Sequence, residues 1–205
     1  MARTPEVVEL IANVTEWPKS DVAMRVRYLT PDGWLPKGGR GLNSPDLTER
    51  HMAALVIAVL AGGPQAEAAK TVRTIGERAA PTLVSAPGPS RPLSTTSPNR
   101  KPLFASGTTF IDALAQAIAW RRDKNPLGDS VVGVGVHTEA GESVGYLTLS
   151  GPLADQPGAA SIGLEFFGPE PDKSSTFGPS YSLSNRAVRI SHATAHLLAA
   201  LAEAA

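Results

Sequence analysis

The sequence predicts an α+β protein in which a mostly helical N-terminal part precedes a small mixed part. Apolar residues recur at helical spacing through residues 5–79, and they alternate with other residues along 131–167. A stretch rich in Pro and Ser separates the two patterns. The length of 205 residues allows one or two domains, so we expect an N-terminal domain at 1–80, a linker at 81–103 and a C-terminal domain at 104–205.

Four helices are predicted in the N-terminal domain, over residues 5–14, 20–29, 44–61 and 65–79. In the second of these, the apolar spacing predicts that Val22, Val26 and Leu29 face the core. The other side of this helix is then free to contact a partner. It carries Asp21, Met24, Arg25 and Tyr28. A Gly-rich basic segment, Lys37-Gly38-Gly39-Arg40-Gly41, follows.

The linker is predicted from composition. Residues 80–103 hold six prolines and four serines without an apolar period, which is typical of an extended or disordered segment. After it, the patterns predict a helix at 108–120, strands at 131–137, 143–150 and 160–167, and a closing helix at 185–204. The C-terminal domain is therefore expected to have about three antiparallel strands flanked by two helices.

Charge and composition limit the function classes. The 19 Lys+Arg balance the 19 Asp+Glu, but residues 1–127 hold 16 basic and 11 acidic residues and the remainder hold 3 and 8. The basic front suggests an anionic partner, or contact between the two halves. The absence of Cys excludes disulfides, thiolate zinc sites and a Cys nucleophile. The longest apolar run, Met52–Ala61, is shorter than the ~20 residues of a bilayer span, and we expect a cytoplasmic protein without membrane contact.

Residues 17–41 have the composition that DNA contact requires. A helix that reads base edges needs polar side chains on its outer face, and a neighbouring Gly-rich tip lets the backbone approach phosphate. The predicted contacts with DNA are Lys19, Ser20, Asp21, Met24, Arg25, Arg27, Tyr28, Lys37, Gly38, Gly39 and Arg40. The structural alternative is a small helical domain in which the Gly-rich segment is only a turn.

This segment also resembles a known family. Its sequence SDVAMRVRYLTPDGWLPKGGRG is similar to the recognition helix and wing of winged helix-turn-helix regulators. Arg27-Tyr28 followed by Gly33-Trp34-Leu35-Pro36 is similar to the Arg-Tyr-Tyr and Gly-Leu-Leu-Pro elements of the MerR family. The resemblance implies a winged helix-turn-helix fold and a DNA-facing role for the N-terminal part. The C-terminal part resembles no MerR effector domain.

Other constellations favour structural roles. His192 and His196 share a helix face at the spacing of zinc ligands, but no Glu base lies between them and no third ligand is evident. Gly133 and Gly135 lie in a continuing strand, unlike a dinucleotide-binding turn. No nucleophile, base and orienting group assemble in the sequence, so we expect no catalytic residues, no metal and no cofactor.

The sequence therefore predicts a DNA-binding transcriptional regulator of bacterial or prophage type. Its N-terminal winged helix would bind double-stranded DNA, and its C-terminal domain would form a homodimer. The alternative is a protein-interaction module, such as a phage assembly or packaging accessory, in which the C-terminal part does the work. Neither hypothesis specifies a small-molecule ligand.

Overall fold

The computed structural model describes residues 3–38, 45–78, 81–85, 104, 107–125, 131–139, 142–149, 162–166, 197 and 199–204. Most of the described residues before position 126 are helical. The helices are α1 (Thr4–Thr15), α2 (Lys19–Leu29), α3 (Glu49–Leu60), α4 (Ala68–Gly76) and α5 (Phe110–Arg122), with a 3-10 turn at Gln65–Glu67. The strands are β1 (Pro81–Ser85), β2 (Val131–Glu139), β3 (Glu142–Leu149) and β4 (Ile162–Phe166). Residues 199–204 are also helical.

The four predicted N-terminal helices are present, with shifted ends. α3 begins at Glu49 because Thr48 provides its N-cap: the Thr48 hydroxyl accepts a hydrogen bond from the backbone N–H of His51. The fourth predicted helix starts as a 3-10 turn after Pro64 and becomes α-helical at Ala68. Its strong amphipathic pattern places Val72 and Ile75 in the core.

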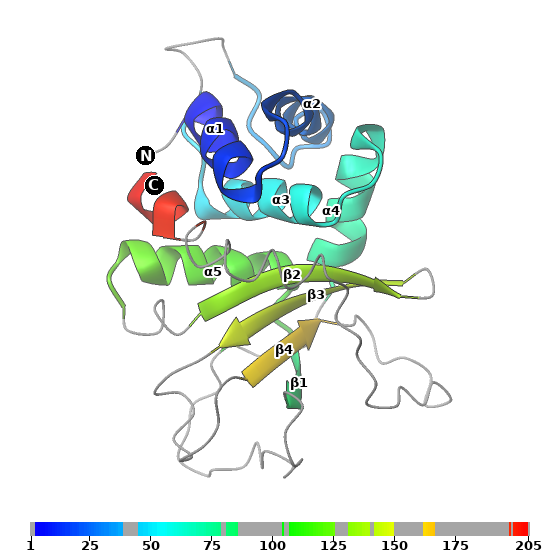
Figure 1. Ribbon diagram of the computed structural model, residues 1–205, viewed down its shortest axis with the longest axis vertical. Coiled ribbons are helices and arrows are strands. Elements are labelled where there is room, and N and C mark those ends of the chain that lie inside the picture. Colours follow the sequence, from blue (N-terminus) through cyan, green and yellow to red (C-terminus); the bar gives the residue numbers. More distant parts are fainter. Residues whose placement is uncertain are drawn as a thin grey trace.

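α3 is the central helix of the fold. Eight consecutive residues, Met52 to Val59, are buried, so α3 has no solvent-facing side along this run. Figure 1 shows α3 between the α1–α2 pair and α5, with the sheet on the other side of α5. A helix that is apolar all round is expected where other elements cover every face.

The four strands form one antiparallel sheet with the order β1-β4-β3-β2. β2, β3 and β4 lie over the three segments for which alternation predicts strands, and β2 pairs with β3 from Val131↔Leu149 to Glu139↔Glu142. β1 was not predicted. Residues 81–85 belong to the predicted linker, yet they pair with β4 from Pro81↔Phe166 to Ser85↔Ile162. Pro81 can occupy this place because it is the first residue of an edge strand.

The helices pack on the sheet through α5 and α4. Phe110, at the start of α5, is fully buried and its ring lies against Gly145 of β3. A Cβ atom at Gly145 would lie 2.3 Å from Phe110 Cδ1, so only glycine allows this approach. The close contact between Gly145 and the Phe110 ring therefore fixes the position of α5 on β3.

The two predicted domains share one hydrophobic core in the described residues. This core runs from Val7 through α3 and α5 to Leu147 and Leu201. α3 contributes to this core on both sides, because it packs against α2 and against α5. The predicted linker residues 86–103 lie outside the described residues, as do residues 185–196 of the predicted closing helix.

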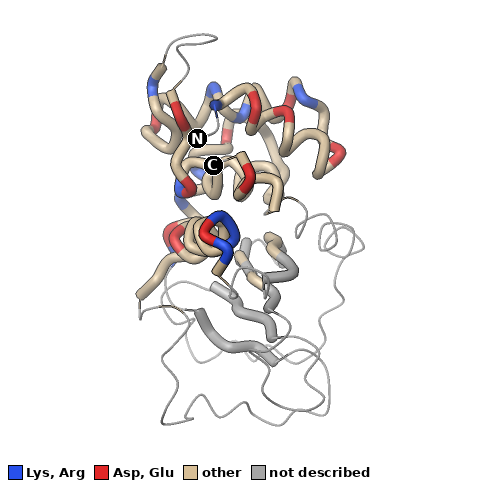
Figure 2. Tube along the Cα trace, turned by 90° about the vertical axis from the view of Figure 1, so that its left-hand side faces the viewer, with Lys and Arg blue, Asp and Glu red and all other residues tan. Residues whose placement is uncertain are grey.

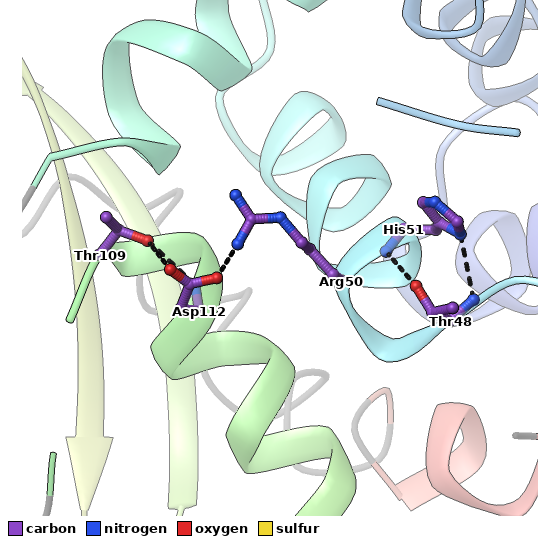
Figure 3. Close-up of polar contacts among 5 residues, drawn as sticks. All are labelled: Thr48, Arg50, His51, Thr109 and Asp112. Atoms are coloured by element: carbon purple, nitrogen blue, oxygen red, sulfur yellow. Dashed lines mark hydrogen bonds and ion pairs between the residues drawn. The ribbon is translucent and has the colours of Figure 1, made fainter. Parts of the chain in front are cut away.

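Polar contacts fix the α3–α5 packing at its rim (Figure 3). Arg50 of α3 forms an ion pair with Asp112 of α5, and Asp112 also accepts a hydrogen bond of 2.6 Å from the Thr109 hydroxyl. A second ion pair of the opposite polarity joins Glu49 to Arg122. All four charged side chains keep contact with solvent, so these pairs orient the helices more than they stabilise them.

Candidate nucleic-acid interface

The candidate interface is the outer side of α2 together with the segment that follows it. α1 and α2 are joined by a turn of three residues, Glu16-Trp17-Pro18, in which Glu16 has the left-handed φ of 57°. Pro18 is the N-cap residue of α2. The first N–H groups of a helix have no carbonyl partner within it, so the missing N–H of proline costs nothing there. In Figure 1, α1 and α2 lie at the end of the molecule remote from the sheet. This location leaves the outer side of α2 accessible.

Burial divides α2 into two sides. Val22, Arg25 and Leu29 are buried, at the spacing i, i+3, i+7. On the opposite side, Ser20 and Arg27 are exposed and Ala23 and Met24 are partly exposed. Tyr28 flanks this side and is 39% exposed, the highest value among the large hydrophobic residues described. Ala23 packs against the core, so we call Ser20, Met24, Arg27 and Tyr28 the outer face of α2.

The structure corrects the role of Arg25. This residue was predicted to contact DNA, but its side chain is only 1% exposed and points into the protein. Its NH1 and NH2 groups donate hydrogen bonds to the carbonyl oxygens of Gly62, at 3.3 Å, and Gly63, at 3.0 Å. Its guanidinium lies 4.9 Å from the centre of the Trp17 ring.

Arg25 therefore connects two turns. It links the turn between α1 and α2, through Trp17, to the turn after α3 at Gly62 and Gly63. Burial lowers the pKa of Arg25 below its ordinary value, and the nearby Asp21 carboxylate partly offsets this shift. The contacts of Arg25 with Trp17, Gly62 and Gly63 therefore hold α2 in a fixed position on the rest of the protein.

Two predicted contact residues lie at the margins of the outer face. Lys19 is exposed, and its Nζ lies 2.9 Å from a carboxylate oxygen of Glu9 on α1. Asp21 is only partly exposed and lies near the buried Arg25. Both side chains are therefore engaged with residues of the protein itself. The accessible part of α2 is its outer face, which lies between these two side chains around the helix.

The segment after α2 is fixed up to residue 38. Gly33 has a φ of 80°, and the backbone N–H of Trp34 donates a 3.1 Å hydrogen bond to the Leu29 carbonyl, which closes the turn. Leu35 is buried, whereas Lys37 and Gly38 are exposed. Gly39 and Arg40, the other two predicted residues of this segment, lie outside the described residues.

Sequence reasoning placed Arg25 on the outer face. The spacing did not decide its side, because Val22, Arg25 and Leu29 fit one helix side as well as Val22, Val26 and Leu29 do, and a core side containing arginine is uncommon. Val26 is partly buried and packs against the core from the edge of this side.

Charges of both signs alternate over the helices (Figure 2). A guanidinium nitrogen of Arg73 on α4 lies 3.5 Å from a carboxylate oxygen of Asp32 in the segment after α2. Arg73, one of the cations near α2, is therefore paired within the protein. In the part of the chain that the structure describes, Lys37 and Arg27 have no carboxylate partner within salt-bridge distance. They are the cations of this region available to an external anion.

No group of three or more His, Asp or Glu side chains that could hold a metal occurs among the described residues, and His192 and His196 lie outside them. Within the same ranges, no helix has the length and apolarity needed to cross a membrane. Comparisons of the chain with protein families, with curated proteins and with solved structures find no match.

Proposed function

We propose that the protein is a sequence-specific double-stranded DNA-binding regulator in which α2 enters the major groove. The observation that carries this proposal is the division of α2. Its inner side is anchored by the buried Arg25, and its outer face presents Ser20, Met24 and Arg27 to solvent. A helix held rigidly at the end of a protein, with unpaired polar groups outward, meets the geometric need of a recognition helix.

The segment after α2 supplies the phosphate contact in this proposal. Lys37 is exposed, lacks a carboxylate partner among the described residues, and follows the turn that closes α2. Phosphate contacts fix the register of a helix on DNA, and base contacts supply specificity. Lys37 together with Gly38 to Arg40 would act as the wing of a MerR-like winged helix-turn-helix. The C-terminal part, with strands β2 to β4, would form the homodimer that sets the spacing of two half-sites.

The test uses the full chain, because α3 packs against elements from both parts. Fluorescence anisotropy measures binding to labelled duplexes from the upstream region of the protein's own gene, and to a scrambled duplex, over a salt series. We expect salt-dependent binding with preference for the upstream duplex. Each lost phosphate contact lowers the slope of log affinity against log salt by about 0.9.

Lys37→Ala tests the phosphate contact. We expect this variant to lower the salt slope by about one contact and to weaken binding to both duplexes equally. Lys124→Ala is the matched control, because Lys124 is an exposed lysine that follows α5 and lies outside the candidate interface. Arg27→Ala removes a base contact in this proposal, so it reduces the preference for the upstream duplex. Absence of binding by the wild type at low salt refutes the proposal and favours the protein-interaction module.

A further inference from the structure

The outer face of α2 is poor in groups that read bases by hydrogen bonds. Among the helix residues Lys19–Leu29 there is no Asn, Gln or His, and the one arginine on the outer face is Arg27. Its NH1 group lies 3.6 Å from the sulfur of Met24. Ser20 adds a single hydroxyl at the start of the helix. Bidentate recognition of adenine by an amide side chain is therefore absent from this helix.

Apolar atoms occupy the middle of the same face. Met24 is partly exposed and lies between Ser20 and Arg27 at the spacing i, i+4, i+7, which places these three residues on one side of the helix, whereas the neighbouring Ala23 packs against the core. Met24 is unbranched and polarizable, so its side chain can adapt to an irregular surface. A partly exposed methionine beside an exposed arginine combines one apolar contact with one cationic donor.

The major groove offers one prominent apolar group, which is the C5-methyl of thymine. We propose that α2 selects sites containing thymine through contact of its C5-methyl group with Met24, while Arg27 contacts a neighbouring guanine. This inference rests on the proposed function, since it requires α2 in the major groove. It names the base whose methyl group the outer face recognises and assigns that contact to Met24.

The experiment first recovers duplexes from a randomised pool with the full chain. The recovered duplex is then synthesised again with deoxyuridine in place of every thymidine. This replacement removes the C5-methyl groups and keeps the hydrogen-bonding pattern. We expect the wild type to bind the uridine duplex about fourfold more weakly for each contacted methyl, because one buried methyl contributes about that factor.

Two variants assign the effect to Met24. Met24→Ala is expected to bind both duplexes equally, and Met24→Leu, which keeps an apolar side chain of similar size, is expected to retain the discrimination. Met24 is only partly buried, so neither substitution disturbs the core, and thermal unfolding of each variant verifies this.

The outcomes separate the inference from the function on which it rests. Salt-sensitive binding with equal affinity for the two duplexes overturns the inference and leaves the proposed function standing. The same holds for a recovered site without thymine, or for discrimination that persists in Met24→Ala. If no duplex binds at low salt, the proposed function itself fails.

Discussion

Arg25 offers the sharpest test of the way α2 is held. We predict that Arg25→Ala lowers the free energy of unfolding by about 3 kcal/mol. The substitution removes both hydrogen bonds to the Gly62 and Gly63 carbonyls and the contact with the Trp17 ring. The control is Arg27→Ala, which removes an exposed arginine from the same helix and is expected to change stability by less than ~0.5 kcal/mol.

The magnitude follows from three contributions. A hydrogen bond from a charged donor contributes about 1.5–3 kcal/mol, and the bond to Gly63 at 3.0 Å is shorter than the one to Gly62 at 3.3 Å. The cation–π contact adds roughly 1 kcal/mol. Against these, burial of the guanidinium is costly, and its Nε has no hydrogen-bond partner among the described residues. Relief of that cost reduces the gross loss to the predicted value.

Urea unfolding followed by tryptophan fluorescence measures the effect. With a slope of about 2 kcal/mol per molar, the predicted loss shifts the midpoint down by about 1.5 M. An Arg25→Ala midpoint that coincides with the Arg27→Ala midpoint would refute the reasoning, because it would mean that the buried contacts add nothing beyond an exposed arginine.

Two other predictions concern the α3 N-terminus and the sheet. The Nδ1 atom of His51 accepts a 3.1 Å hydrogen bond from the N-cap backbone, and burial lowers its pKa, with the adjacent guanidinium as a smaller cause. The contribution of this bond is therefore present above pH ~6.5, the ordinary pKa, and is lost as the pH falls through the lower folded-state pKa. His51→Gln keeps an acceptor that does not titrate, so its unfolding midpoint is expected to depend less on pH below ~6.5 than that of the wild type; equal slopes would contradict this. Gly145→Ala forces a Cβ into the Phe110 ring and is expected to cost about 3 kcal/mol in thermal or urea unfolding, whereas Gly76→Ala, whose nearest contact is 3.4 Å, is the control expected to be neutral or slightly stabilising. If Gly145→Ala unfolds at the same midpoint as the wild type, the Phe110 ring can move aside, and the prediction is wrong.

The helices were predictable where one side of each is apolar. α1 and α2 match their predicted ranges within one residue, because apolar spacing and the flanking Pro18 and Pro31 mark their ends. The burial of α3 on all sides was not predicted. Periodicity reports an apolar stripe, and the alanines of α3 gave no sign that neighbours cover the helix on all sides.

β1 and Arg25 were not predictable from local patterns. Residues 81–85 lie among prolines, and only the pairing with β4, some 80 positions later in the sequence, makes them a strand. The side of α2 on which Arg25 lies depends on the two carbonyl oxygens that approach from the turn after α3. Such partners are set by tertiary packing, which a pattern within one helix does not contain. The other candidate contact residues of α2 stay predictions from helical spacing and composition.

The burial of α3 bears on how such a chain can evolve. α3 contacts α2 on one side and α5 on the other, and Met52 to Val59 have no face left for water. Without α5, the apolar side of α3 that α5 covers would meet water. A foreign domain joined to the first four helices would therefore have to match that surface. Substitutions in α5 are constrained by the shape of α3, so each half of the protein limits the sequences that the other can accept.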